Sequence, residues 1–294
     1  MDESRRLTER FEEHRSHLRA VAYRMLGSLS EAEDAVQETW LRMNRSDTSE
    51  VENLAGWLTT VVSRVCLNML RSRETRREES IEAYPTDPAA NREDGIDPEQ
   101  EAELADSVGL ALLVVLDKLA PAERLAFVLH DMFSVPFDEI APMIEKTPAA
   151  TRQLASRARR RVKGEPLVPA TDLSRQRRVV DAFLAATRGG NFDALVTLLH
   201  PDVVLTADKA VIPSPEAILI SGAVTVATGA MAAMQRAQAT QTALVNGVVG
   251  LAMAPYGQLF LVLRFTVKDD LITEIDVVAE PERLRELDLA VLDA

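Results

Sequence analysis

This chain of 294 residues has very little cysteine and no long apolar run. Its single cysteine, Cys66, excludes both an internal disulfide and a zinc site built from several cysteines. No apolar stretch reaches the roughly 20 residues of a transmembrane helix, and residues 1–6 lack the apolar segment of a signal peptide. We therefore expect a cytoplasmic protein, and no motif calls for a metal ion or a cofactor.

Charge is unevenly spread along the chain, whose net charge is −13. Residues 74–106 hold twelve acidic and three basic residues, with prolines scattered among them. Such a composition is typical of a linker, because it cannot build a core of its own. A second seam, with two prolines, lies at 164–169. These boundaries predict a helical block at 5–73, an acidic flexible linker at 74–103, a helical block at 104–164, a short linker at 165–174 and a third module at 175–288.

Residues 147–163 carry six basic side chains and no acidic one. Thr147 can cap a helix and Pro148 suits the first helical position, so a helix is predicted to begin here. Its apolar positions recur every four residues and comprise Leu154, Ala158 and Val162. Its polar positions lie on another face and comprise Gln153, Ser156, Arg157 and Arg160. One face is expected to pack and the other to contact a polyanion.

A short helix is predicted just before the basic one, at 137–145. Its inner side comprises Phe137, Ile140 and Ile144. Only Lys146-Thr147 separates the two helices, which is typical of a helix-turn-helix whose second helix enters a major groove of DNA. Pro142 should distort the first helix because it lacks an amide donor. The alternative interpretation is a solvated arginine-rich helix on a helical bundle.

The N-terminal block shows helical periodicity over 11–43, broken by a turn at 27–30. Ser30 followed by Glu33 resembles a capping box, which predicts that the second helix begins there. That helix, 31–42, exposes acids and an amide. The side chains near it that can pack are Ala35, Val36, Trp40 and Met43.

A third helix is predicted over 55–73. Its apolar side comprises Leu58, Val61, Val62, Val65 and Met69. Its polar side comprises Arg64, Asn68, Arg71 and Arg73. Cys66 follows Val62 by one turn and is interpreted as a core residue. Trp57 stands at the start of the helix, where its ring either stacks on an unpaired base or anchors the helix in the core.

Three motifs occur in a fixed order along the helical blocks. They are Asp34-Ala35-Val36-Gln37-Glu38-Thr39-Trp40, Gly56-Trp57-Leu58 and, after the acidic linker, Ser156-Arg157-Ala158-Arg159. In this order and spacing they resemble a bacterial extracytoplasmic-function sigma factor, and the resemblance covers about residues 8–164. It implies that 5–73 is the helical bundle called region 2 and that 104–164 is the helix-turn-helix module called region 4.

The resemblance implies one polymerase-binding surface and two DNA-binding modules. Region 2 would grip a coiled coil on the largest subunit of core RNA polymerase through Asp34, Gln37, Glu38 and Leu41. It would hold the melted −10 strand of promoter DNA, with one base extruded into a pocket, through Asn53, Trp57, Arg64, Asn68 and Arg71. Region 4 would read the −35 element as duplex through Arg152, Gln153, Ser156, Arg157 and Arg160. The sequence leaves open which arginine meets a base and which a phosphate.

The chain continues for about 130 residues beyond Gly164. Helices are predicted at 174–188, 192–199 and 223–236, and strands at 203–206, 242–253, 258–267 and 271–278. This order indicates an α+β fold with a curved antiparallel sheet. The motifs Gly189-Gly190-Asn191-Phe192-Asp193-Ala194-Leu195 and His200-Pro201-Asp202-Val203 resemble the cone-shaped SnoaL-like fold of the NTF2-like superfamily. A subset of extracytoplasmic-function sigma factors carries such a domain and ends in a motif similar to Pro281-Glu282-Arg283-Leu284.

Some relatives of the cone fold are enzymes, but the sequence argues against catalysis here. No Asp, Glu or His occurs from Ala217 to Lys268, which holds most of the predicted sheet. The candidates that remain for proton transfer are Asp181, His200, Asp208, Tyr256 and Asp276. His200 is expected at a surface turn before Pro201. Six apolar residues either line a pocket for a small apolar ligand or form an ordinary core: Met231, Met234, Leu251, Met253, Phe260 and Phe265.

These features predict a sigma factor, not an enzyme, that directs core RNA polymerase to specific promoters and is regulated in cis by its C-terminal domain. Two alternatives stay open, a helix-turn-helix regulator with a ligand-sensing domain and an NTF2-like enzyme. The acidic helix around 34–41 argues against the first, because a repressor that never joins polymerase has no use for it. The missing carboxylates argue against the second.

Overall fold

The computed structural model describes residues 2–47, 51–79, 109–211, 217–255 and 258–292. The chain divides into two compact units. The N-terminal unit comprises Met1–Leu104 and Leu116–Arg160, and the C-terminal unit comprises Ala105–Val115 and Arg161–Ala294. The predicted linker at 74–103 lies outside the described residues from residue 80 onward, and its first six residues belong to a helix.

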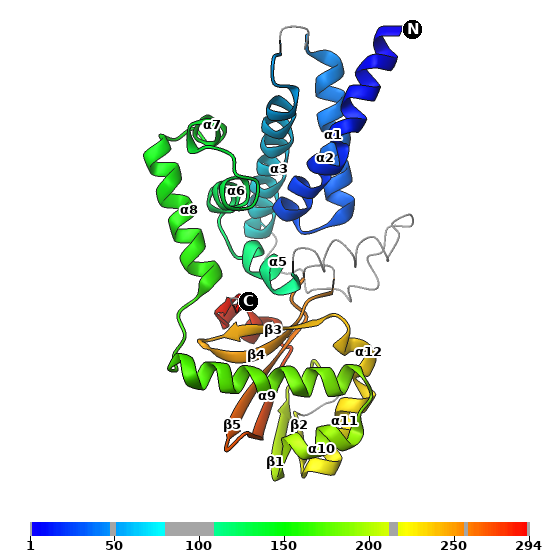
Figure 1. Ribbon diagram of the computed structural model, residues 1–294, viewed down its shortest axis with the longest axis vertical. Coiled ribbons are helices and arrows are strands. Elements are labelled where there is room, and N and C mark those ends of the chain that lie inside the picture. The colour runs from blue at the N-terminus through cyan, green and yellow to red at the C-terminus, as the bar shows by residue number, and fades with distance from the viewer. Residues whose placement is uncertain (1, 48–50, 80–108, 212–216, 256–257, 293–294) are drawn as a thin grey trace. The chain divides into compact units, whose positions relative to one another are not determined.

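Three long helices pack side by side in the N-terminal unit (Figure 1). They are α1 (Asp2–Leu26), α2 (Leu29–Arg45) and α3 (Leu54–Glu79), which confirms the three helices that periodicity predicts. Gly27 ends α1 in the left-handed region, with φ at +75°. The predicted capping box at Ser30 is wrong, because α2 begins at Leu29 and the Ser28 and Ser30 hydroxyls bond each other at 2.9 Å. Burial of the Leu29 side chain accounts for its place in the first turn.

One predicted surface residue of α3 instead ties the bundle together. Arg73 forms an ion pair with Glu31 of α2, its Nε lying 3.0 Å from Glu31 Oε1. It also donates a hydrogen bond to the Leu26 carbonyl oxygen at the end of α1, at 3.2 Å. Arg73 therefore joins α3 to the turn between α1 and α2. Periodicity within α3 does not reveal this role, since both partners lie more than forty residues away in sequence.

Cys66 lies in the core of the bundle, as its spacing predicts. Burial raises the pKa of its thiol to about 12, so the thiolate that reacts with alkylating reagents is nearly absent at pH 8. We expect native protein to take up no maleimide at pH 8 within the time that denatured protein needs for complete labelling. Mass spectrometry of timed samples checks this, and rapid labelling of the native protein would show that the bundle opens around α3.

The rest of the N-terminal unit is built from short helices and ends in a long one. The short elements are α6 (Pro121–Phe127), a π-helical turn at Val128–Met132, α7 (Phe137–Ile140) and a 3-10 turn at Ala141–Met143. The predicted helix at 137–145 is therefore too long, and Pro142, which cannot donate an amide hydrogen bond, lies in the 3-10 turn. Ile140 and Ile144 are buried as predicted, whereas Phe137 is half-buried and stacks on His130 with ring centroids 3.7 Å apart.

The long helix is α8 (Pro148–Lys163), which begins where its capping signals predict. Thr147 Oγ1 accepts a hydrogen bond from the Ala150 amide at 3.2 Å. Leu154 and Ala158 are buried, and Val162 is half-buried. The amphipathic pattern of the basic helix is thus confirmed, with its apolar side packed.

A seven-stranded sheet dominates the C-terminal unit, in the order β2-β1-β6-β5-β4-β3-β7. Its strands are β1 (Leu199–Ala207), β2 (Ile218–Ser221), β3 (Thr240–Val245), β4 (Val248–Met253), β5 (Leu261–Lys268), β6 (Leu271–Val278) and β7 (Leu289–Ala290). Neighbouring strands are antiparallel except β1 and β6, which are parallel. A turn at Asn246-Gly247 joins β3 to β4 and so divides the strand predicted at 242–253, and a turn at Asp269-Asp270 joins β5 to β6. Each turn has two residues at positive φ.

The helices of this unit are α5 (Leu110–Asp117), α9 (Ala170–Arg188), α10 (Phe192–Leu198), α11 (Ala223–Ala232), α12 (Met234–Ala237) and α13 (Pro281–Glu286). The last residues of α5, Leu116 and Asp117, fall in the N-terminal unit. An α+β architecture is therefore confirmed. The two edge strands β2 and β7 escaped prediction because they are only four and two residues long.

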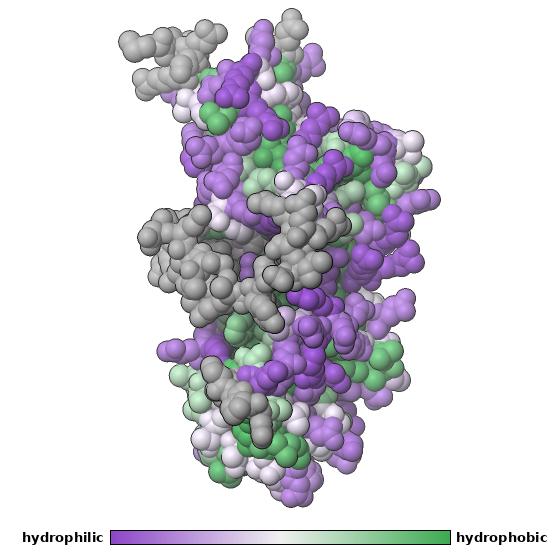
Figure 2. All heavy atoms as spheres, turned by 180° about the vertical axis from the view of Figure 1, so that it is seen from behind, coloured by the Kyte–Doolittle hydropathy of each residue, from purple (hydrophilic) through white to green (hydrophobic). Residues whose placement is uncertain are grey.

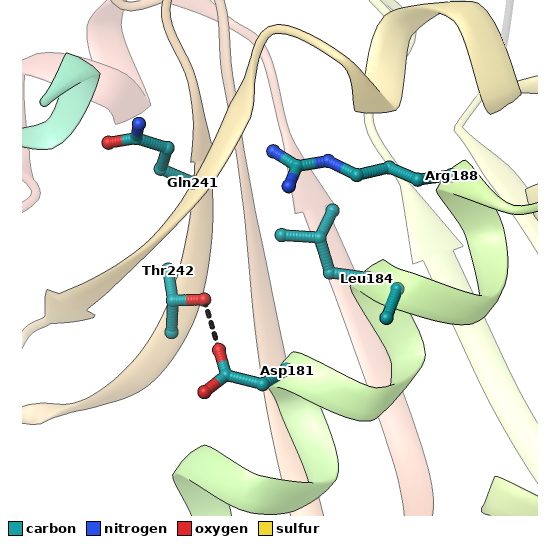
Figure 3. Close-up of a pocket in the computed structure, with 6 residues that line it drawn as sticks. Asp181, Leu184, Arg188, Gln241 and Thr242 are labelled. Atoms are coloured by element: carbon teal, nitrogen blue, oxygen red, sulfur yellow. Dashed lines mark hydrogen bonds between the residues drawn. The ribbon is translucent and has the colours of Figure 1, made fainter. Parts of the chain in front are cut away.

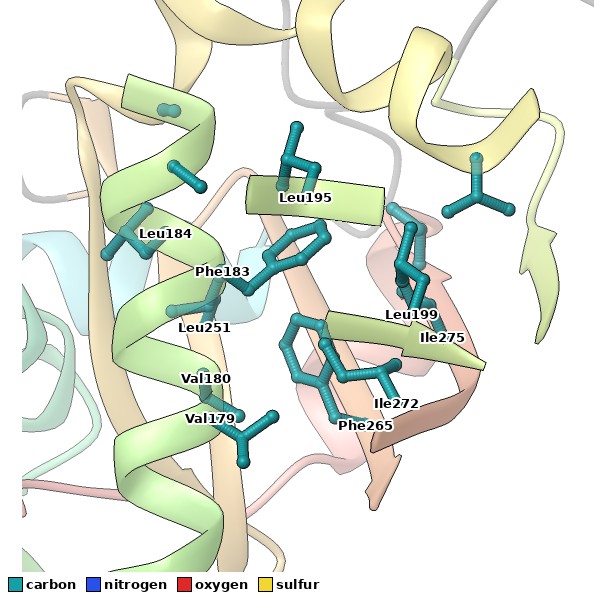
Figure 4. Packing of buried hydrophobic residues seen from close by; sticks show 14 of the residues in the cluster. Val179, Val180, Phe183, Leu184, Leu195, Leu199, Leu251, Phe265, Ile272 and Ile275 are labelled. Carbon is teal, nitrogen blue, oxygen red and sulfur yellow. The ribbon is translucent and has the colours of Figure 1, made fainter. Parts of the chain in front are cut away.

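Both faces of the central strands are buried. One face packs on α9 and α10, where Phe183 meets Phe265 edge to face with ring centroids 5.4 Å apart (Figure 4). The other face carries Ala243, Ala252 and Val262, which pack among side chains from α5 and α13. A sheet buried on both sides has little room for unpaired acids, which accounts for their absence from residues 217–268.

Candidate functional site

The outer face of α8 is polar and exposed, as its sequence predicts. Arg152, Gln153, Ser156, Arg157 and Arg160 are all exposed. The structure thus brings the five predicted −35 residues onto one surface, opposite the buried side of the helix. Hydrophilic side chains also cover most of the described surface that Figure 2 shows, where apolar ones form only small separate patches.

Three arginines of α8 are held by neighbouring elements. Arg157 Nε lies 3.0 Å from Glu123 Oε1 on α6, and Arg159 Nε lies 2.6 Å from Asp131 Oδ1. The Arg152 guanidinium lies over the ring of Phe137, 5.4 Å from its centroid. Restraint of this kind lowers the side-chain entropy that an arginine loses when it binds a ligand.

The predicted polymerase-binding residues form one face of α2. Asp34 and Gln37 are exposed, and Glu38 accepts a hydrogen bond from Arg42 Nε at 2.9 Å. Leu41 keeps 39% of its surface exposed, which is unusual for a leucine on a helix whose other side is buried. The face therefore combines two acids and an amide with one apolar side chain.

The predicted −10 residues lie along α3. Arg64, Asn68 and Arg71 are exposed on one side of the helix. Asn53 precedes the helix and caps it, because its Oδ1 accepts a hydrogen bond from the Gly56 amide at 2.9 Å. The capping role was not predicted, although Asn is one of the residues preferred at the position just before a helix.

The two tryptophans differ in their surroundings. Trp40 lies against Phe11, with ring centroids 5.1 Å apart, and so belongs to the bundle. Trp57 is half-buried, and among the described residues its ring stacks on no other aromatic ring. The exposed part of the Trp57 ring lies at the N-terminal end of the basic side of α3.

Sequence reasoning missed a buried arginine in α6. Arg124 keeps 1% of its surface exposed, and burial lowers its pKa to about 10. Its Nε donates to the Arg24 carbonyl oxygen at 3.3 Å, and its Nη1 lies 3.5 Å from Asp117 Oδ1. It remains protonated at neutral pH, where the burial of its charge opposes folding. Arg124 thereby connects α6 to α1, a contact that no local pattern signals.

The residues proposed for an apolar ligand lie in the C-terminal unit. Leu251, Met253 and Phe265 are buried in the core, and Met231 and Phe260 pack against it. Met234 is exposed instead. These side chains fill the interior between the sheet and its helices, so the described residues give no support to a small apolar ligand there.

The candidates for proton transfer fall in different places, except that Asp208 and Asp276 both lie beside Arg283. Asp208 is buried and accepts hydrogen bonds from the Ala279 and Glu280 amides at 2.8 and 2.9 Å. Asp276 Oδ2 lies 3.2 Å from Arg283. His200 lies within β1, which corrects the predicted turn, and its Nδ1 accepts from the Asp202 amide at 3.1 Å. Tyr256 lies outside the described residues.

A shallow pocket lies between α9 and β3, and Figure 3 shows the residues that line it. Thr242 Oγ1 donates to Asp181 Oδ1 at 2.5 Å, and Arg188 Nε donates to the Ala237 carbonyl oxygen at 2.9 Å. Gln241 Oε1 accepts from the Ala111 amide at 3.3 Å. The polar groups of the pocket thus hold the unit together.

Comparison with known proteins decides the family. The family model of Sigma-70 region 2 matches residues 10–76, and that of Sigma-70, region 4 matches residues 109–162. The ECF RNA polymerase sigma factor SigJ of Mycobacterium tuberculosis is 38% identical over 93% of this chain and 91% of its own length. The chain belongs to the extracytoplasmic-function family of RNA polymerase sigma factors. This sigma factor therefore directs core RNA polymerase to promoters.

A second relative agrees. The probable sigma factor SigI of the same species is 38% identical over 65% of this chain and 66% of its own length. The crystal structure of SigJ covers 95% of this chain and 98% of its own, at 33% identity and a TM-score of 0.45. Because the SigJ sequence match spans 93% of this sigma factor, it continues through the C-terminal unit. Within the described ranges, no helix has the length and hydropathy that crossing a bilayer requires.

Proposed function

We propose that this sigma factor uses three helix faces for three partners. The acidic face of α2, with Leu41, binds the coiled coil of the largest polymerase subunit. The basic side of α3, with Trp57, holds the melted −10 strand, and the exposed face of α8 reads the −35 duplex. The observation that carries the proposal is that each face is exposed while the opposite side of its helix is buried, so these side chains are not needed for packing.

In vitro transcription tests this assignment. Purified core RNA polymerase is mixed with the full-length protein and a promoter library, and the transcripts are sequenced. We expect initiation that depends on the protein and a shared −35 and −10 sequence among the active promoters. Sequence-specific duplex binding without any initiation would favour a helix-turn-helix regulator.

We further propose that the C-terminal unit regulates region 4 by holding its first helix. The region 4 match begins at residue 109 and so includes α5. Ala111, Val114 and Val115 of α5 are buried, and they pack in clusters with residues of the sheet and of α13. A helix held in this way cannot leave the sheet without exposing those apolar side chains to water. The docked state is therefore suited to restrain region 4.

A disulfide between α5 and β3 tests this restraint. Ala111→Cys combined with Ala243→Cys joins two residues of one buried cluster, and Cys66 is too deeply buried to interfere. We expect the oxidised protein to initiate less transcription than the same protein after reduction, whereas each single variant should respond to neither treatment. Deletion of everything after Gly164 is less informative, because it also uncovers α5. Equal initiation before and after reduction would exclude a regulatory release of α5.

A further inference from the structure

We infer that Glu123 positions Arg157 as a base-reading arginine of α8, whereas Arg160 binds backbone phosphate. The inference rests on the proposed function of α8, which is to read the −35 element, and gives its arginines different DNA contacts. It makes Glu123, a residue of α6 outside the predicted DNA-binding set, a determinant of promoter specificity.

The geometry of the pair supports a positioning role for Glu123. The Glu123 side chain is only 10% exposed, whereas the Arg157 side chain is 53% exposed. Glu123 Oε1 lies 3.0 Å from Arg157 Nε in an ion pair, so the Nε end of the guanidinium faces this carboxylate of the protein. Arginine has five N–H donors in a rigid fork, and four of them lie on the two terminal nitrogens. Fixing Nε therefore sets the plane in which the terminal nitrogens are presented.

A fixed plane matters for a base and much less for a phosphate. Guanine offers O6 and N7 side by side in the major groove, and an arginine reads both through two parallel hydrogen bonds. Such a pair requires the fork to approach in the plane of the base. A phosphate attracts a cation from many directions, and this attraction carries no sequence information. The restrained arginine thus fits the base-reading role.

Arg160 lacks this restraint. Its side chain is exposed, and within the described part of the chain its guanidinium forms no ion pair. It also lies nearly one helical turn further from the N-terminus of α8 than Arg157 does. Recognition helices contact base edges mainly through their N-terminal residues. Its place further along α8 and the absence of a restraining ion pair both indicate that Arg160 binds backbone phosphate.

The pair of Asp131 and Arg159 provides a matched comparison. It has the same chemistry, with Asp131 Oδ1 at 2.6 Å from Arg159 Nε. Arg159 is two residues from Arg157, which places it about 200° around the helix from that arginine. Neutralising Asp131 should therefore perturb an ion pair of α8 without touching the base-reading arginine.

These roles of Arg157 and Arg160 are tested by transcription from a promoter library that is randomised across the −35 element. The assay uses the full-length protein with core polymerase. We expect Arg157→Ala to reduce the preference for G·C at one base pair about 10- to 100-fold. Arg160→Ala should weaken initiation on all promoters alike and make binding less sensitive to salt. Glu123→Gln keeps the size of the side chain and the charge of Arg157, and should reduce the same single-position preference about 2- to 10-fold. Asp131→Asn should leave that preference as in the wild type.

The double variant Glu123→Gln with Arg157→Ala distinguishes positioning from general damage. If Glu123 acts through Arg157, the double variant shows the preference profile of Arg157→Ala alone. An unchanged profile in Glu123→Gln, or a loss spread evenly over all positions, would overturn the inference while protein-dependent initiation by the wild type would still uphold the proposed function. Absence of initiation by the wild type would instead overturn the proposed function.

Discussion

A Leu41→Asp variant is expected to bind core RNA polymerase at least about 30-fold more weakly than the wild-type protein, the change that loss of a binding hot spot produces. Leu41 is the one large apolar side chain on an otherwise polar face, and it lies one helical turn beyond Gln37 and Glu38. A partly exposed leucine ringed by polar groups is the type of side chain that fills a pocket on a partner. An added carboxylate would have to enter that pocket without a counter-charge.

Fluorescence anisotropy of labelled protein titrated with purified core polymerase measures this affinity. Val224→Asp is the matched control, because Val224 is also an exposed apolar residue on a helix, at 62% exposure, and has no assigned partner. Both variants should melt within a few degrees of the wild type, since neither side chain is buried. Equal affinity of Leu41→Asp and wild type for core would place the polymerase surface elsewhere.

Local signals in the sequence predict much of the N-terminal fold and of the candidate site. The start of α8 follows from Thr147 and Pro148, because a cap and a first-turn proline act within four residues. The exposed faces of α2, α3 and α8 follow from helical period alone. These features depend on neighbours in sequence, and the structure confirms them.

Contacts between distant segments explain what the sequence does not predict. Arg73, Glu123 and Arg124 are charged residues in helices, where charge ordinarily indicates solvent exposure. Each is partly or fully buried, because a partner from another helix forms a hydrogen bond or an ion pair with it. Arg124 and the Arg24 carbonyl are 100 residues apart, and no periodicity connects them.

The boundary between the modules is also set by contacts between distant segments, which the sequence does not predict. Composition places one module at 104–164 and a later one at 175–288, and α5 belongs to the first by sequence. In the structure the apolar side chains of α5 are buried on strands more than 120 residues further along the chain. A break in composition marks where a linker runs, whereas a compact unit is defined by where apolar surface is buried. The proposal that the C-terminal unit regulates region 4 follows from this difference between the place of α5 in the sequence and the place where its side chains are buried.

Replacing Trp57 with Ala is expected to reduce the formation of open promoter complexes about 10- to 100-fold, because stacking of a base on an aromatic ring contributes on the order of 1–3 kcal/mol. The ring lies at the end of the basic side of α3 and, among the described residues, no other aromatic ring stacks on it. Trp57→Phe should recover most of the loss, since it restores an aromatic face. Permanganate reactivity of unpaired thymines in the −10 element measures the melted fraction directly.

Trp40 separates base stacking from a purely structural role for Trp57. Its half-buried ring lies against the buried Phe11, so Trp40→Ala should lower the free energy of unfolding by ~2–4 kcal/mol. Trp57→Ala should lose promoter melting with a much smaller loss of stability in thermal unfolding. If the two variants instead destabilise the protein equally, and melting falls only in proportion to the unfolded fraction, Trp57 is an anchor of α3. The −10 strand would then have to be held by Arg64, Asn68 and Arg71 without an aromatic platform.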